Sequence, residues 1–330
     1  MPPGRFNSPN EDPMRSFVLR CSTLALLLGL ASCEVPGDPT QPTDGPLFAR
    51  SANPASALEA AVTALGNDVN AALRSTGSEF EVSTIEYLTA GEEIGRSVFF
   101  GNVGNKRLPQ DFVAGDPRRD WSGAGEGDDI TWASDLVQGD AGVGAGATQA
   151  AIASAMGTWD GVTCSMLPLT LLNAAGNLGV IEASIFGVDV DPAADVVHAG
   201  FGSILDLFLP PPIIATTFTF WWVDSATRIP TDIDNDRRLD VAFREIYYTN
   251  NFPWSLTGAG GIDIETVVLH ETGHGLSQAH FGQLFQTDSN GRFHFSPRAV
   301  MNAGYTGPQR SIGTSDSAGH CSNWASWPSN

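Results

Sequence analysis

The sequence predicts an α/β fold, because strand-like and helix-like segments alternate along most of the chain. Residues at helical spacing place Ile152, Met156 and Trp159 on one side of a predicted helix at 148–162. A second helical segment begins after the glycines at 260–261, with acidic residues in its first turn. Short apolar runs typical of strands precede and separate these helices. Such an order favours a sheet with helices packed against it in layers.

The other elements follow in chain order from the same periodicities. Apolar residues at helical spacing from Leu58 to Leu73 predict a first helix, which either belongs to a small pro-segment or packs on the body of the protein. The stretch 115–129 is rich in glycine and aspartate and is expected to be a loop. Strands are expected at 80–88, 97–100, 130–136, 195–201, 216–224 and 242–250.

The composition is that of a globular, acidic protein. Of the 330 residues, 42% are hydrophobic and 16% are charged. Thirty-seven acidic residues against 17 basic ones give a formal net charge of −20. Because a phosphate backbone would be repelled by this charge, nucleic-acid binding is not expected.

Residues 1–33 resemble an export signal with a lipoprotein-type end. Arg15 and Arg20 precede an apolar run, and small residues lead to Cys33. The sequence Leu-Ala-Ser-Cys at 30–33 resembles the lipobox of bacterial lipoproteins, in which the cysteine carries the lipid. We therefore predict an exported protein, either anchored in the cell envelope membrane through Cys33 or secreted into the medium after cleavage nearby.

The exported chain divides into a tether and one functional domain. Residues 34–79 predict a flexible tether followed by a short helix, and residues 80–330 predict the domain. Cys164 and Cys321 are the cysteines of that domain, and two thiols in an oxidising compartment predict one disulfide. Two separate buried thiols are the alternative.

Three of the six histidines lie within residues 270–280. On a helix, His270 and His274 are one turn apart on the same face, so both can reach one Zn²⁺. Glu271 stands beside the first of these ligands, where it can meet a water molecule, and His280 would return from beyond the helix as the third ligand. Three protein ligands leave one coordination position open, which is typical of catalytic zinc. A chance cluster of histidines is the alternative.

This segment resembles the zinc signature HExxHxxGxxH of the metzincins, a family of zinc proteases. The matching residues are His270, Glu271, His274 and His280. The segment AVMNAGY at 299–305 resembles the Met-turn of the family, and the spacing from Met301 to Tyr305 is similar to that in matrixins. The resemblance, which covers roughly residues 130–305, implies Met301 as an apolar floor beneath the ligands and Tyr305 as a packing or pocket residue.

The metzincin resemblance also implies a fold and an activity. The expected fold is a twisted mixed sheet with a zinc-binding helix below it and an irregular C-terminal lobe. The expected activity is hydrolysis of protein or peptide substrates, with Glu271 taking a proton from the attacking water. A non-catalytic zinc-binding surface lipoprotein that binds a partner is the rival hypothesis.

The sequence departs from the family pattern in two ways. Ser277 replaces the glycine between the second and third histidines, where the backbone needs positive φ to leave the helix. The position of His280 therefore depends on how the chain bends at Ser277. In addition, no cysteine resembling the matrixin switch precedes the domain, so the resemblance supports no thiol-based latency.

An acidic segment at 231–240 offers a second candidate metal site. Four carboxylates match positions 1, 3, 5 and 9 of a Ca²⁺-binding loop, namely Asp232, Asp234, Asp236 and Asp240. However, Arg237 replaces the loop glycine and Phe243 replaces the bidentate glutamate. A solvated acidic turn is the alternative to a stabilising calcium site.

The remaining histidines are not expected to bind metal. His198 lies in an apolar strand and is expected in the core, whereas His294 and His320 lie in glycine- or serine-rich surroundings and are expected at the surface. Trp324 and Trp327 are expected to pack the C-terminal tail.

Overall fold

A mixed sheet forms the centre of the computed structural model, which describes residues 56–329 apart from 92, 102–109, 122, 124–126, 136–141, 173–178 and 203–204. Within the described residues, nine strands pair in the order β13-β1-β7-β8-β6-β4-β5, with β2 beside β1 and β3 beside β8. The strands are β1 (Phe80–Ala90), β2 (Ser97–Phe99), β3 (Gln110–Asp111), β4 (Ile130–Ser134), β5 (Leu169–Leu171), β6 (Val196–Gly200), β7 (Ile213–Trp222), β8 (Leu239–Tyr248) and β13 (Gly304–Tyr305). The pairing is parallel from β5 to β8 and antiparallel where β7 joins β8 and β1.

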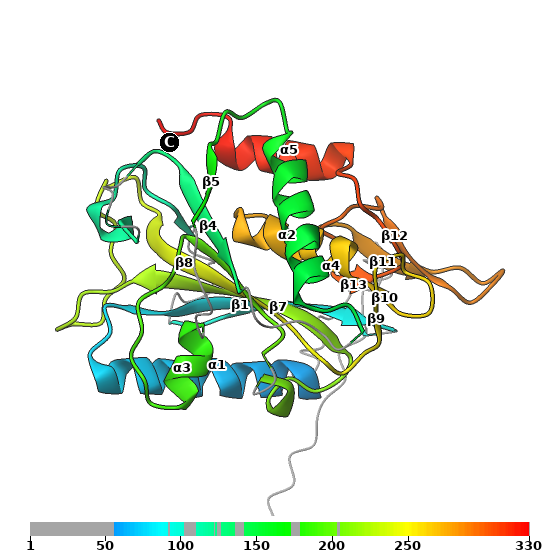
Figure 1. The fold of residues 1–330 in the computed structure, drawn as a ribbon, viewed down its shortest axis with the longest axis horizontal. Coiled ribbons are helices and arrows are strands. Elements are labelled where there is room, and N and C mark those ends of the chain that lie inside the picture. Colours follow the sequence, from blue (N-terminus) through cyan, green and yellow to red (C-terminus); the bar gives the residue numbers. More distant parts are fainter. Residues whose placement is uncertain are drawn as a thin grey trace, which may run out of the picture. The chain divides into compact units, whose positions relative to one another are not determined.

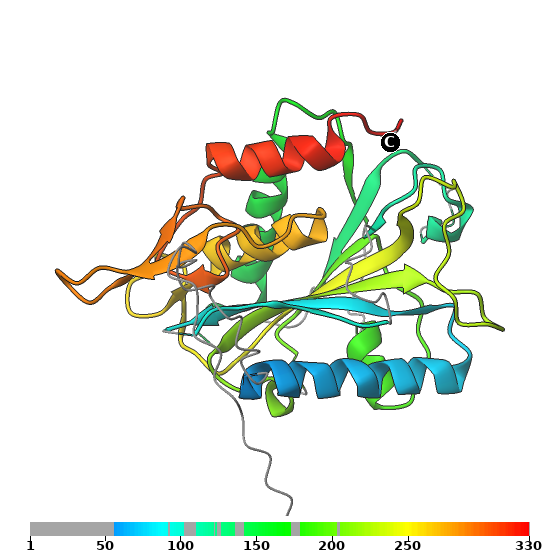
Figure 2. The same ribbon diagram turned by 180° about the vertical axis from the view of Figure 1, so that it is seen from behind.

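Helices cover both faces of this sheet. Helices α1 and α3 lie against one face, whereas α2, α4 and α5 lie on the other (Figure 1, Figure 2). Their bounds are α1 (Ala57–Thr76), α2 (Ala145–Asp160), α3 (Val180–Ile185), α4 (Ile264–Gly275) and α5 (Thr314–Trp324). Two short 3-10 helices and two small two-stranded sheets complete the described elements, namely η1 (Pro117–Arg119), η2 (Leu205–Leu207), β9 (Trp254–Ser255) with β10 (Ile262–Asp263), and β11 (Gln283–Gln286) with β12 (Phe293–Ser296). The twisted mixed sheet with its five helices confirms the predicted fold class.

Each face of the sheet has its own hydrophobic core. Trp159 of α2, Val267 of α4 and Met301 belong to one core, and Val62 of α1 and Ile181 of α3 belong to the other. Every residue of β7 is buried, because the strand has neighbours on both sides and helices over both faces. This double covering explains why even its three threonines, Thr216, Thr217 and Thr219, are buried.

The expected elements and segments can be located in the structure. The first predicted helix is α1, and it packs on the sheet through contacts with β1. The predicted signal at 1–33, Cys33 and the tether up to residue 55 lie outside the described residues. None of the helices among the described residues is long and apolar enough to cross a membrane.

The predicted disulfide is confirmed. Cys164 and Cys321 are bonded, with Cα atoms 5.6 Å apart, and they connect the segment after α2 to α5. The surface placement expected for His320 is wrong, since its side chain is 1% exposed and stacks on Trp159. Ser165 lies 2.9 Å from His320 Nε2, which gives this buried ring a polar partner.

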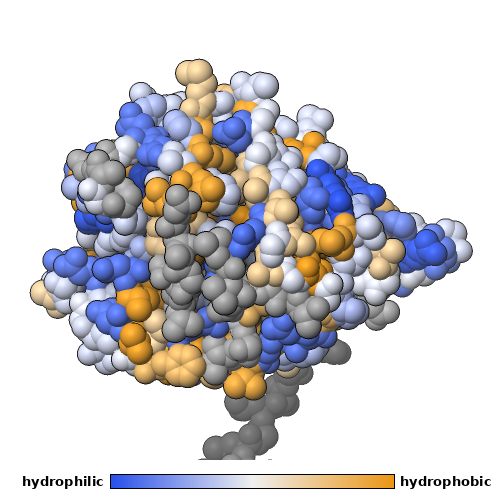
Figure 3. Space-filling view, in the orientation of Figure 1, coloured by the Kyte–Doolittle hydropathy of each residue, from blue (hydrophilic) through white to orange (hydrophobic). Residues whose placement is uncertain are grey.

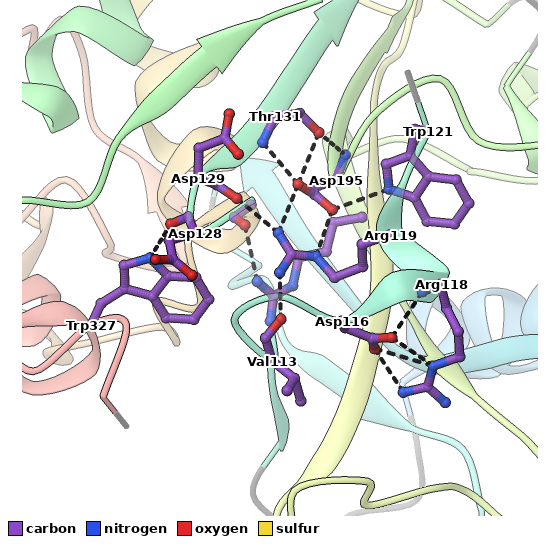
Figure 4. Close-up of polar contacts among 12 residues, drawn as sticks. Val113, Asp116, Arg118, Arg119, Trp121, Asp128, Asp129, Thr131, Asp195 and Trp327 are labelled. Carbon is purple, nitrogen blue, oxygen red and sulfur yellow. Dashed lines mark hydrogen bonds and ion pairs between the residues drawn. The ribbon is translucent and has the colours of Figure 1, made fainter. Parts of the chain in front are cut away.

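A buried ion pair fixes the loop between β3 and β4. The carboxylate of Asp195 accepts two hydrogen bonds from the Arg119 guanidinium, at 2.8 and 2.9 Å, and one from the Trp121 indole at 3.1 Å (Figure 4). The backbone and hydroxyl of Thr131 donate to the same carboxylate, both at 2.8 Å. A segment predicted only as loop is thus anchored from inside, because the paired charges satisfy each other where water is excluded.

The β11–β12 hairpin projects from the body beside α4 (Figure 1). Its tip at 287–292 is hydrophilic (Figure 3). Phe281 and Phe285 nearer its base are 46% and 44% exposed.

Candidate metal centre

The imidazole rings of three histidines converge on one point beneath the sheet. His270 and His274 extend from α4, and His280 lies on the segment that follows the helix. The Nε2 atom of His274 is 3.1 Å from the Nε2 atoms of both His270 and His280. These separations are close to the roughly 3.3–3.4 Å expected for three nitrogens bound tetrahedrally to one Zn²⁺.

The hydrogen bonds behind the rings fit a bound cation. The Nδ1 atom of His270 lies 2.7 Å from the carbonyl oxygen of Val300, and that of His274 lies 2.8 Å from the carbonyl oxygen of Gln278. A carbonyl oxygen can only accept, so both Nδ1 atoms carry the proton and both Nε2 atoms present lone pairs. Two lone pairs facing each other at 3.1 Å repel unless a cation lies between them.

Ser277 makes the sharp bend that brings His280 back. Its φ is +66°, the conformation that the family glycine would supply. The Gln278 amide donates to the Gly273 carbonyl at 2.8 Å, and the Ser277 amide donates to the His274 carbonyl at 3.0 Å, which together form a Schellman motif. Arg244 then donates to the Ser277 hydroxyl at 2.9 Å. The helix therefore ends as the zinc signature requires, although glycine is absent.

Met301 lies beneath the helix that carries the histidines. Its side chain is 1% exposed, and its sulfur packs so close to Gly273 that no side chain fits there. The carboxylate of Asp316 accepts from the backbone amides of Val300 and Met301, at 3.0 and 3.1 Å, and holds this turn. The hydroxyl of Tyr305 accepts from the Asp263 amide at 3.0 Å, at the start of α4.

Glu271 is buried beside the three rings. Its Oε2 atom accepts a hydrogen bond of 2.6 Å from the hydroxyl of Thr217 on β7. Its Oε1 atom has no hydrogen-bond partner among the described residues. Burial raises the pKa of this carboxyl group to about 7. One oxygen is thus held by the sheet, and the other is free to exchange a proton.

A second carboxylate, Glu86 on β1, lies against His274. Its Oε2 atom is 3.0 Å from Nδ1 of His274, and its Oε1 atom accepts from the Ser97 hydroxyl at 2.9 Å. Burial works to raise the pKa of Glu86, but the neighbouring His274 outweighs burial and brings the pKa to about 2. Sequence reasoning missed both Thr217 and Glu86. Thr217 carries no signal in its strand, whereas an acidic residue at an inward position of an apolar strand could have been noticed.

Most of the centre is shielded from solvent. His270, His274 and Glu271 are 2%, 1% and 0% exposed. His280 is half-buried and faces a cavity of about 300 Å³ on the side of α5, which is also lined by Met301.

The acidic loop between β7 and β8 brings some of its carboxylates together. Oxygens of Asp232, Asp234 and Asp240 lie within 4.8 Å of one another, while Asp236 is outside this group. Asp240 already accepts from the guanidinium of Arg118 at 2.8 Å. The loop residue that replaces the glycine, Arg237, has φ of +74°, the left-handed conformation suited to glycine.

His198 lies in the core, as its apolar strand predicted. The ring is fully buried, and its Nδ1 atom is 2.9 Å from the hydroxyl of Tyr248. Burial lowers the pKa of His198 to about 3, so this ring is neutral.

The chain matches no family model and no curated protein.

Proposed function

We propose that this protein is an exported zinc-dependent endopeptidase of metzincin type. The observation that carries the proposal is the convergence of the Nε2 atoms of His270, His274 and His280. The helix that bears two of these rings also carries Glu271, whose Oε1 atom has no hydrogen-bond partner among the described residues. The His-rich donor set, with two Nδ1 protons held by carbonyl oxygens, suits Zn²⁺. When bound there, Zn²⁺ would lower the pKa of a water molecule and polarise the carbonyl of a peptide bond.

Glu271 has the environment of a general base and acid. Because Thr217 holds Oε2 at 2.6 Å, Oε1 is the oxygen left without a hydrogen-bond partner among the described residues. With its pKa raised to about 7, the group can take a proton from the attacking water and return it to the leaving amine near neutral pH. Met301 beneath the helix keeps the floor of the centre apolar.

Two finer assignments belong to the same proposal. Export rests on the signal-like residues 1–33, with attachment to a membrane lipid at Cys33 or secretion as the two possible outcomes. The substrate class is protein or peptide, since the proposal rests on the resemblance to a protease family.

The rival function is a non-catalytic zinc-binding surface lipoprotein that binds a partner. One observation favours it, because His270, His274 and Glu271 are at most 2% exposed. A metal held away from solvent suits a structural role better than a catalytic one.

The replacement Glu271→Gln separates the two functions. We expect one Zn²⁺ per chain in both the wild type and the variant, because the variant keeps all three histidines. Hydrolysis of a peptide library, followed by mass spectrometry over long incubations, should fall at least 1,000-fold in the variant. A chelator should abolish the wild-type activity. Equal hydrolysis by both proteins would refute the role of Glu271, and zinc binding without any hydrolysis would support the rival.

A further inference from the structure

Strand β7 marks the place where a peptide would have to lie. Its residue Thr217 holds Glu271, so β7 runs directly past the proposed reacting groups. Extended peptides commonly bind by adding a strand to an open sheet edge. One side of β7 is paired with β8, and only the other side could therefore receive a peptide.

That side of β7 is occupied by β1 of the same chain. The two strands run antiparallel, with Glu86 directly opposite Thr217. On its far side, β1 runs parallel to β13, with Thr89 opposite Gly304, and antiparallel to β2. The strand is thus bonded on both sides where it crosses the metal centre.

The side chains of Glu86 and Leu88 on β1 lie against the histidines. The Glu86 carboxylate lies 3.0 Å from His274, and Leu88 lines a hollow of about 20 Å³ together with His270. Because β1 takes up the edge of β7 that β8 leaves open, a peptide can pair with β7 at this place only after β1 moves.

We propose that β1 is a built-in occupant of the peptide-binding position and keeps the proposed peptidase latent until the strand is displaced. This inference rests on the proposed function. It accounts for the burial of His270, His274 and Glu271, which would otherwise favour the rival function.

The contacts of β1 indicate how the strand is held. Two register shifts interrupt its pairing with β7, between Val82 and Thr84 and between Leu88 and Thr89. At the first shift, the Asn70 side chain of α1 replaces the missing partners, since it accepts from the Val82 amide at 2.7 Å and donates to the Val82 carbonyl at 3.0 Å. Asn70 lies on the sheet face opposite the metal centre, so a change there weakens β1 without touching the histidines.

A lock and a loosening variant test the proposal in the full-length protein. The lock is a disulfide between β1 and β7, introduced by the double variant Leu88→Cys with Ala215→Cys at two directly paired residues. Paired antiparallel residues have Cα separations of about 4.5–5.5 Å, which a disulfide can span. The loosening variant is Asn70→Ala. Controls are the two single-cysteine variants and Ser184→Ala, which loses a buried hydroxyl bonded to the Ile181 carbonyl at 2.8 Å on α3, outside β1 and the strands paired with it.

Two readouts are measured on each protein, after confirming one metal ion per chain. The first is peptide hydrolysis, and the second is binding of a tripeptide hydroxamate to the cobalt-substituted protein, followed by its visible spectrum. We expect the lock to reduce both the hydrolysis rate and hydroxamate binding at least 100-fold. We expect Asn70→Ala to raise both about tenfold, because a larger fraction of molecules is open. Ser184→Ala and the Ala215→Cys single variant should behave as wild type, and the Leu88→Cys single variant is the reference for the lock, because both lack the Leu88 side chain.

The outcomes distinguish this inference from the proposed function. A locked protein that hydrolyses peptides at the wild-type rate would overturn the inference and leave the peptidase standing. If Asn70→Ala gains hydroxamate binding but no form hydrolyses peptides, β1 is displaced as proposed and the peptidase function fails. If neither readout responds to the lock or to Asn70→Ala, the inference is wrong.

Discussion

Ser277 is the residue on which the third metal ligand depends. The sequence predicted a costly bend, because a non-glycine residue with positive φ loses roughly 1–2 kcal/mol. The structure supplies two compensating contacts, since Arg244 donates to the Ser277 hydroxyl at 2.9 Å and Asn323 donates to the Ser277 carbonyl at 2.8 Å. The serine is therefore part of a bonded corner between the helix, the sheet and α5.

Replacing Ser277 by alanine and by glycine separates backbone strain from the hydroxyl contact. Both variants lose the hydrogen bond from Arg244, but only alanine keeps the cost of positive φ. We expect Ser277→Ala to be less stable than Ser277→Gly by about 1 kcal/mol, measured by urea denaturation of the metal-free proteins. Equal stability of the two variants would mean that φ at this position carries no strain.

His198 should contribute to acid unfolding. Burial lowers its pKa to about 3 in the folded protein, whereas the pKa in the unfolded chain is about 6.5. As the pH falls from 6.5 toward 3, the unfolded state gains a proton that the folded state does not, so the free energy of unfolding falls. Below pH 3 both states are protonated and this contribution stops changing.

The variant His198→Gln tests this titration. Between pH 6.5 and 3, its free energy of unfolding should fall less steeply than that of the wild type. The two slopes should differ by up to about 1.4 kcal/mol per pH unit, which corresponds to one proton. Denaturant curves at a series of pH values give the slope. His294→Gln, a change of a partly exposed ring, is the control, and an unchanged slope in His198→Gln would contradict the expectation.

At the scale of elements, the disulfide links α5 covalently to the segment after α2. It joins residues 157 positions apart in the sequence, so it restricts a large part of the unfolded chain. We expect Cys164→Ser with Cys321→Ser to lose about 4 kcal/mol of unfolding free energy. Chemical denaturation under non-reducing conditions measures the loss. Either single replacement should lose a similar amount, and a double variant as stable as wild type would contradict the expected role.

The acidic loop between β7 and β8 remains a predicted calcium site. Asp232 and Asp234 approach Asp240, but Arg118 already neutralises part of the charge. If calcium binds, millimolar Ca²⁺ should raise the melting temperature of the wild type. The melting temperature of the double variant, Asp232→Asn with Asp234→Asn, should stay unchanged. Asp224→Asn, in the same connection but outside the group, is the matched control. An unchanged wild-type melting temperature would contradict the site.

For the whole molecule, removal of the metal should lower stability. Without a cation, the lone pairs of His270 and His274 face each other at 3.1 Å. We expect a chelator to lower the melting temperature of the wild type and added Zn²⁺ to restore it, in proportion to the logarithm of zinc concentration. His274→Ala should not respond to either treatment. A wild type that melts at one temperature in all conditions would exclude a metal at this centre.

The parts of the molecule that were predictable are those set by local periodicity. The helical repeat fixes His270 and His274 on one face, and apolar runs indicated the strands of the sheet. The location of β1 was not predictable, because its pairing of Thr89 with Gly304 joins distant parts of the chain. His320 was wrongly expected at the surface, since the polar neighbours in α5 gave no sign of the ring of Trp159 above it.

Two indoles give the protein an intrinsic optical reporter. Trp159 donates to the Leu269 carbonyl at 2.9 Å, and Trp324 donates to the Leu276 carbonyl at 2.8 Å, so both fluorophores touch the helix that bears the histidines. Their emission depends on the polarity around each ring and on the hydrogen bond that each makes. Loading or loss of an ion at this helix can therefore be followed by tryptophan fluorescence alone, in real time and without an attached dye.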